Sequence, residues 1–125
     1  MPKKQNILVV DDDVEIVEYM ETLLTMKGYD VLKAYNGHDG LEKAKNEKPD
    51  LILLDFLMPG ISGMEVCRLL KADPLTKNIP IILLSSVESL DIVKSFLQMG
   101  VAECIKKPPD PKILIDKIEM AIEMR

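Results

Sequence analysis

The chain has 125 residues, of which 47% are hydrophobic and 30% charged, and its formal net charge at pH 7 is −5. This length and composition predict one globular domain with a single sizeable core, and no apolar run is long enough to span a bilayer. The acidic balance argues against a nucleic-acid-binding surface, and the N-terminus lacks the apolar segment of a secretory signal, so we expect a cytoplasmic protein.

Short β-rich segments alternate with segments of helical length and period along the whole chain. The expected strands are Ile7–Val10, Val31–Tyr35, Leu51–Leu54, Ile81–Leu84 and Ala102–Ile105. The expected helices are Val14–Lys27, His38–Asn46, Met64–Lys71, Leu90–Met99 and Lys112–Met124.

The boundaries of these segments agree with that assignment. Asp13 is suited to cap the first helix and Gly28 to end it, and Asp110 followed by Pro111 is a typical start for the last helix. The runs ILVV, LILL and IILL do not alternate with polar residues, which indicates strands buried on both faces. Right-handed crossovers between such strands predict a doubly wound α/β fold with a parallel sheet between two helical layers.

Charged or hydroxyl-bearing residues follow four of the five expected strands, and each has an ordinary interpretation on its own as a cap, a turn residue or a solvated charge. In a doubly wound sheet, however, the carboxyl ends of the strands meet where ligands bind. Carboxylates that meet there repel one another unless something compensates them, and Mg²⁺ with oxygen ligands is the natural compensation. The residues concerned are Asp11, Asp12, Asp13, Asp55, Ser85, Ser86, Lys106 and Lys107.

Four motifs resemble the receiver domain of two-component response regulators in order and spacing: VVDD (Val9–Asp12), DxxMPxxxG (Asp55–Gly63), PIILLS (Pro80–Ser85) and KP (Lys107–Pro108). The resemblance covers essentially the whole chain. It implies a flavodoxin-like fold of five parallel strands in the order 2-1-3-4-5, with residues 1–125 as one receiver domain. Such a domain either stands alone, as a shuttle or a messenger partner, or is cut from a longer chain.

The implied function is that of a signalling switch, not of an enzyme acting on other substrates. The switch takes a phosphoryl group from a histidine kinase or a phosphotransfer protein. By resemblance, Asp55 is the phosphoacceptor, and Asp11 and Asp12 are the acidic pair that holds Mg²⁺ together with Asp55 and the main-chain carbonyl of Leu57. These roles suit phosphoryl transfer, which requires positioning and charge neutralisation.

The resemblance also assigns residues to the response. Ser85 corresponds to the switch hydroxyl and Lys107 to the lysine that pairs with the phosphoryl group, with a cis bond between Lys107 and Pro108. Two positions depart from the family pattern, because Cys104 and Pro109 stand where aromatic residues are usual. Without the aromatic at residue 104, the output is expected to travel through backbone and helix movement.

Two apolar side chains bear on how long the signal lasts. In the family, the residues two after the acceptor and two after the switch hydroxyl flank the path of the hydrolytic water. Here they are Leu57 and Val87, and neither can hydrogen-bond a water molecule. We therefore expect slow self-hydrolysis of the phosphoryl group.

The segments Leu90–Met99 and Lys112–Met124 carry more apolar residues than one buried stripe needs. Either the buried face is wide, or some of the excess forms a surface for an output domain, a partner protein or a phosphorylation-dependent homodimer. Cys67 and Cys104 are too few for a disulfide scaffold, and we expect both to be reduced packing residues.

Three alternative classes fit the sequence less well than the receiver domain. An aspartyl-nucleophile phosphatase needs a second acid two residues after the nucleophile, where this chain has Leu57. A nucleotide-binding module needs a glycine- or serine-rich loop after the first strand, where three aspartates would repel a phosphate. A degenerate receiver would lack one of Asp55, Lys107 or the acidic pair, all of which are present.

Overall fold

The computed structural model describes residues 4–86 and 89–125, in which five strands alternate with five helices. The strands are β1 (Asn6–Val10), β2 (Asp30–Ala34), β3 (Leu51–Asp55), β4 (Ile81–Ser85) and β5 (Glu103–Lys106). The helices are α1 (Val14–Met26), α2 (Gly37–Glu47), α3 (Gly63–Ala72), α4 (Leu90–Gln98) and α5 (Pro111–Glu123). Every expected element is present, and the ends differ from expectation by at most one residue.

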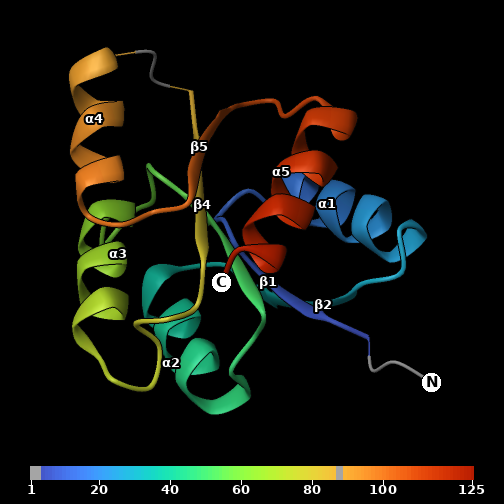
Figure 1. Ribbon diagram of the computed structural model, residues 1–125, viewed down its shortest axis with the longest axis horizontal. Helices are drawn as coiled ribbons and strands as arrows, with labels where there is room; N and C mark the ends of the chain where they lie inside the picture. The colour runs from blue at the N-terminus through green and yellow to red at the C-terminus, as the bar shows by residue number, and fades with distance from the viewer. Residues whose placement is uncertain (1–3, 87–88) are drawn as a thin grey trace.

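The five strands form one parallel sheet in the order β2-β1-β3-β4-β5. Helices α1 and α5 cover one face of the sheet, and α2, α3 and α4 cover the other (Figure 1). The inner strands β3 and β4 are buried along their whole length, and β1 is buried in all but its first residue. The predicted doubly wound, flavodoxin-like fold is therefore confirmed.

The sheet separates two hydrophobic cores, and the helices are anchored in them to different extents. Buried residues of α1 and α5, such as Met20 and Ile118, pack on one face, and those of α3, such as Val66, pack on the other. Of the described residues of α4, Phe96 alone is buried. Because each fully buried apolar side chain contributes about 1.5–3 kcal/mol, α4 is held to the sheet less firmly than α1 or α5.

The first and last helices begin as expected. The side chain of Asp13 accepts hydrogen bonds from the backbone N–H groups of Glu15 and Ile16, and Asp110 caps α5 in the same way ahead of Pro111. The cap at Asp13 fixes the turn between β1 and α1, so the acidic residues after β1 are held at the edge of the sheet.

At the amino-terminal end of the strands, Arg125 is bonded to Asp50, the residue before β3. One guanidinium nitrogen of Arg125, Nη1, lies 2.9 Å from Oδ1 of Asp50 and donates a hydrogen bond to the Asp50 carbonyl oxygen at 3.1 Å. The other carboxylate oxygen of Asp50 accepts a hydrogen bond from the backbone N–H of Asn6 at 2.8 Å.

Among the described helices, none has the length and apolar character needed to cross a membrane.

The start of α3 sits against the end of β3 because residue 63 has no side chain. A Cβ on Gly63 would lie 2.8 Å from the carbonyl oxygen of Phe56 and closer still to that of Asp55. These are backbone atoms, so they cannot rotate out of the way as the end of a side chain can. The loop between β3 and α3 is consequently tight.

We predict that Gly63→Ala lowers the free energy of unfolding by about 1–3 kcal/mol, the usual cost of overpacking, even though alanine is the better helix former. Urea denaturation of the two proteins measures the difference. Equal or higher stability of the variant would contradict the tight contact between α3 and the end of β3.

Candidate functional site

Two buried carboxylates lie side by side at the carboxyl edge of the sheet. Asp11 directly follows β1 and Asp55 ends β3, and these strands are paired in register at Val10 and Leu54. Asp11 is 1% exposed and Asp55 4% exposed, whereas the neighbouring Asp12 is exposed to solvent. Oxygen atoms of the three carboxylates all lie within 4.8 Å of one another. The expected convergence of these aspartates is confirmed.

One ammonium group lies between the two buried carboxylates. Nζ of Lys107 is 2.6 Å from Oδ2 of Asp11 and 3.0 Å from Oδ1 of Asp55. The bond between Lys107 and Pro108 is cis, as the resemblance implied, and the backbone N–H of Lys107 donates to the carbonyl oxygen of Ser85 at 2.9 Å. The end of β5 thereby brings a positive charge to aspartates that follow two other strands.

The electrostatic environment shifts the pKa of both Asp55 and Lys107. Burial raises the pKa of Asp55 from its ordinary value of 3.8 to about 6, and the charge of Asp11 acts in the same direction. Hydrogen bonds from Lys107 and from the backbone of Leu57 act to lower it. Burial acts to lower the pKa of Lys107, but its bonds to the two aspartates outweigh burial and raise it. Lys107 therefore stays charged at neutral pH.

Asp11 has a second fixed partner that the sequence analysis missed. Its Oδ1 accepts a hydrogen bond from the backbone N–H of Asp13 at 2.9 Å, an Asx-type turn within the β1–α1 loop. An aspartate two residues before a helix cap is the signal that could have found it. Asp11 is thus held by the loop on one oxygen and by Lys107 on the other.

Two further predicted site residues, Ser85 and Leu57, come from chain segments next to Asp55. Ser85 is the last residue of β4, 8% exposed, and stands opposite Lys106 in the sheet register. Leu57 lies in the loop after β3, and its side chain is 58% exposed. Val87, the other residue expected along the water path, lies outside the described residues. Both cysteines are free: Cys67 is buried and Cys104 is half-buried.

The acidic cluster has the composition of a site for a hard divalent cation. Three carboxylates and the one ammonium of Lys107 leave a net charge of −2, from −3 and +1. Mg²⁺ typically takes one or two carboxylates and keeps several waters, and the exposed Asp12 opens the cluster to solvent. The residues present therefore fit Mg²⁺, with oxygen atoms as the ligands.

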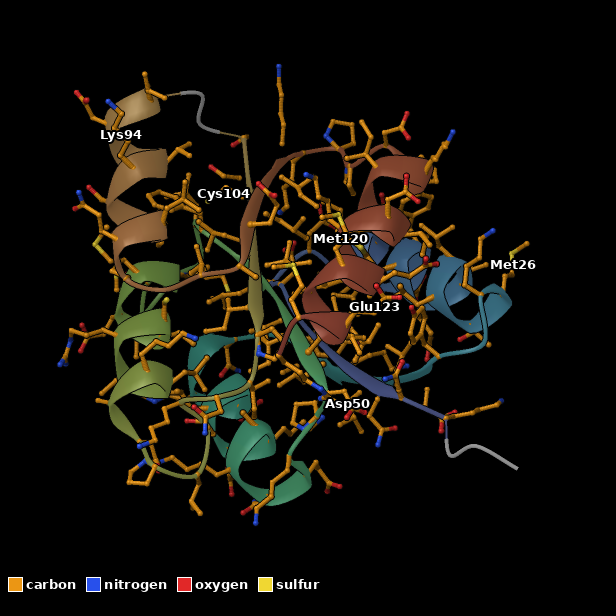
Figure 2. All side chains as sticks on the ribbon, viewed as in Figure 1. Met26, Asp50, Lys94, Cys104, Met120 and Glu123 are labelled. Carbon is orange, nitrogen blue, oxygen red and sulfur yellow. The ribbon has the colours of Figure 1, made fainter. Side chains whose placement is uncertain are left out.

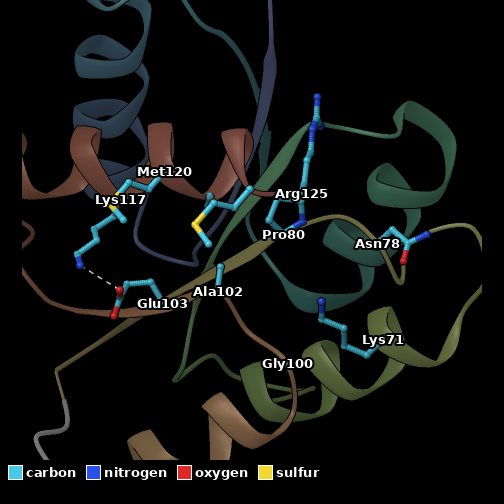
Figure 3. A pocket seen from close by; sticks show the side chains of 11 residues that line it. Lys71, Asn78, Pro80, Gly100, Ala102, Glu103, Lys117, Met120 and Arg125 are labelled. Carbon is cyan, nitrogen blue, oxygen red and sulfur yellow. Dashed lines mark ion pairs between the residues drawn. The ribbon is translucent and has the colours of Figure 1, made fainter.

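A cavity at the opposite edge of the sheet has a different character. It has a volume of about 310 Å³ and lies between the starts of β4 and β5 and the end of α5 (Figure 3). Nζ of Lys117 lies 3.1 Å from Oε2 of Glu103 there, and Met120 and Pro80 form part of the apolar wall. Two of its charged groups, Lys117 and Arg125, are paired with carboxylates of the chain, so the acidic cluster is the stronger candidate for chemistry.

Comparisons with known proteins agree on one family. The family model described as "Response regulator receiver domain" matches residues 7–119. The phosphate regulon transcriptional regulatory protein PhoB of Pseudomonas aeruginosa is 39% identical over 118 residues, which are 94% of this chain and 52% of that protein. Response regulator PleD of Caulobacter vibrioides is 38% identical over 112 residues, 90% of this chain and 25% of that protein.

Solved structures give the same answer. A CheY-like response regulator receiver domain protein from Methanospirillum hungatei JF-1 superposes with a TM-score of 0.89 at 31% identity, covering 98% of this chain and 96% of that one. The chain therefore matches whole receiver domains among the solved structures, but spans only about half, or a quarter, of the curated relatives named above.

The raised pKa of Asp55 predicts how stability depends on pH in metal-free buffer. The folded state binds this proton more tightly than the unfolded chain, so the free energy of unfolding falls as pH rises from about 4 to about 6. We expect Asp55→Asn to be more stable than the original chain at pH 8, by up to about 3 kcal/mol, and the difference to shrink toward pH 4.

Urea denaturation in EDTA at several pH values measures this difference. Asp12→Ala is the matched control: it also relieves repulsion, but its carboxylate is exposed and its stabilising effect should be smaller. A stability difference between Asp55→Asn and the original chain that does not vary with pH would contradict the raised pKa of Asp55.

Proposed function

Because the chain belongs to the family of response regulator receiver domains, which act in two-component signal transduction, we propose that Asp55 accepts the phosphoryl group that operates the switch. The observation that carries the proposal is the position of Asp55: it ends a fully buried strand and lies 3.0 Å from the ammonium of Lys107. A nucleophile fixed in this way needs little further ordering to reach an in-line geometry.

The proposed reaction is a transfer from a phosphohistidine. One carboxylate oxygen of Asp55 forms the new bond to phosphorus while the bond from phosphorus to the donor's imidazole nitrogen breaks. The raised pKa of Asp55, about 6, leaves the carboxylate ionised at neutral pH and more basic than an ordinary aspartate. The reaction needs no general base, because the attacking carboxylate carries no proton.

We propose that Asp11, Asp12, Asp55 and the main-chain carbonyl of Leu57 hold Mg²⁺, as the oxygen-rich, negatively charged cluster allows. When bound, the ion would neutralise charge on the transferring phosphoryl oxygens. The backbone N–H of Asp13 and the ammonium of Lys107 keep the Asp11 carboxylate in place.

The proposed response begins at Lys107 and Ser85. In the unphosphorylated structure the ammonium of Lys107 is shared by Asp11 and Asp55, and a phosphoryl group would offer it a more highly charged partner. Ser85 would supply a hydroxyl to another phosphoryl oxygen. Since the Ser85 carbonyl accepts the backbone N–H of Lys107, movement of the two residues would be coupled.

The proposed partners are a histidine kinase or a phosphotransfer protein as donor, and an output domain, a second protein or a second copy of the chain as receiver of the signal. The α4–β5–α5 face suits the second group, because several large apolar side chains are exposed there: Leu90, Leu97, Ile113, Met120 and Met124. Of the two alternatives for the apolar excess in these helices, a wide buried face does not apply to these five exposed residues. We place the exchange in the cytoplasm, where ATP supplies such kinases.

The same geometry argues against turnover of other phosphorylated substrates. Residue 57 is an exposed leucine, so the loop carries no acid to protonate a leaving group or to activate a water. The proposed role is accordingly that of a switch whose chemistry is confined to its own Asp55.

We predict that acetyl phosphate with Mg²⁺ adds one phosphoryl group to the chain and that Asp55→Asn abolishes the addition. Intact-mass spectrometry under non-acidic conditions measures it. Asp50→Asn is the matched control, because Asp50 adjoins the other end of the same strand and is paired with Arg125. Undiminished labelling of Asp55→Asn would move the acceptor elsewhere and refute the proposal.

The lifetime of the phosphoryl group tests the role of residue 57. Leu57→Asn offers a water ligand that leucine lacks, and a contact worth about 1.4 kcal/mol in the transition state would speed hydrolysis roughly tenfold. Leu57→Val, which stays apolar, should leave the rate unchanged. The measurement is phosphoryl decay after removal of the donor. Decay within seconds in the original chain, not quickened by asparagine, would refute shielding by Leu57.

A further inference from the structure

The two phenylalanines of this chain contact each other beside the proposed phosphorylation site. The ring centroids of Phe56 and Phe96 are 5.2 Å apart, and the ring planes meet at 76°, an edge-to-face arrangement. Aromatic pairs favour this geometry because the positive edge of one ring faces the negative face of the other. Neither residue has a role in the proposed chemistry.

The backbone of Phe56 is hydrogen-bonded to the end of β4 and to the start of α3. It directly follows Asp55, and its N–H donates to the carbonyl oxygen of Leu84 at 2.9 Å. Its own carbonyl oxygen accepts from the N–H of Gly63 at 3.0 Å. The residue before Ser85 and the first residue of α3 are therefore both hydrogen-bonded to Phe56, so a displacement at the end of β4 or at the start of α3 would shift its ring.

Phe96 is the anchor of α4. It is 0% exposed, and the other apolar side chains of that helix include Leu90 at 65% and Leu97 at 46% exposed. The carbonyl oxygen of Phe96 also accepts the N–H groups of Met99 and Val101, which lead from α4 toward β5. Phe96 is the one fully buried side chain among the described residues of α4, and Ile92 is only partly buried in the same core, so a shift of the Phe96 ring would displace the helix.

We infer that Phe56 is a positioning residue that couples the phosphorylation state of Asp55 to α4 through its ring contact with Phe96. The inference rests on the proposed function and names how the signal leaves the site. Close-packed interiors shift between discrete arrangements and do not deform continuously, so a ring-to-ring contact can transmit a small displacement as a change of packing. Cys104 of β5 (Figure 2) packs against the hydrophobic core that contains Phe96, but its side chain carries no ring.

The test compares α4 with and without the phosphoryl mimic beryllofluoride in the presence of Mg²⁺. Hydrogen exchange, followed by mass spectrometry, reports on Leu90–Gln98 as the response and on residues 57–62 as proof that the mimic has bound. In the original chain we expect the exchange of α4 to change by about tenfold, a typical size for coupled sites. In Phe56→Leu the change should fall below about twofold, with the response of residues 57–62 retained.

Two further variants separate coupling from packing. Phe56→Tyr keeps the ring and should restore the response of α4, and Ile92→Val, which trims α4 within the same cluster, should not abolish it. Phe96→Leu should lose the response to the same extent as Phe56→Leu, and the double variant should lose no more, because both changes remove one contact.

A full α4 response in Phe56→Leu, or effects of Phe56→Leu and Phe96→Leu that add, would overturn the inference. So would an α4 that does not respond in the original chain when residues 57–62 do. Phe56 is only partly buried, so its variant tests the inference even if Phe96→Leu does not fold. Failure of the proposed function is distinguishable, since it would appear as phosphorylation of Asp55→Asn.

Discussion

The ammonium of Lys107 lies between two carboxylates that are almost completely removed from water, and the arrangement of the site depends on this contact. Carboxylate oxygens of Asp11 and Asp55 lie within 4.8 Å of each other, and two like charges that close would normally force one carboxylate to take up a proton. Burial raises the pKa of Asp55 to about 6 and the charge of Asp11 acts in the same direction, while Lys107 offsets only part of the rise. The exposed Asp12 supplies the third carboxylate of the cluster, whose net negative charge suits a further cation.

The sheet order makes this contact available. Asp11 and Asp55 follow adjacent strands, but Lys107 follows β5, which is separated from β3 by β4. Only a long side chain can reach across β4 to both carboxylates, and the short link from the Lys107 N–H to the Ser85 carbonyl sets the point from which it reaches. Gly63 contributes from the other side by letting α3 start close to the end of β3. Charged side chains from three separate segments, the ends of β1, β3 and β5, thus occupy one small volume.

The elements of the fold could be predicted from the sequence because their signals are local. The unbroken apolar runs before Asp11 and Asp55 indicate buried parallel strands, and Asp13 and Asp110 mark helix starts. The order of the strands and the roles of the site residues came from the resemblance of the motifs. Side-chain contacts between distant segments could not be read in this way. Asp11 and Asp12 are neighbours in sequence, yet one is buried and the other exposed. The contact of Phe56 with Phe96 likewise depends on the tilt and depth of α4, which no local pattern encodes.

The unequal anchoring of the helices divides the molecule into a part that resists change and a part, α4, that permits it. The α1 and α5 side is stabilised by many buried aliphatic side chains, whereas α4 has a single buried residue. Substitutions that enlarge or trim the first core would alter the melting temperature and leave the amplitude of switching largely intact. Additional anchors for α4 would do the reverse, giving a protein that melts higher but signals poorly. Thermal robustness and responsiveness thus depend on different helices, and each could be adjusted, in evolution or in the laboratory, with little effect on the other.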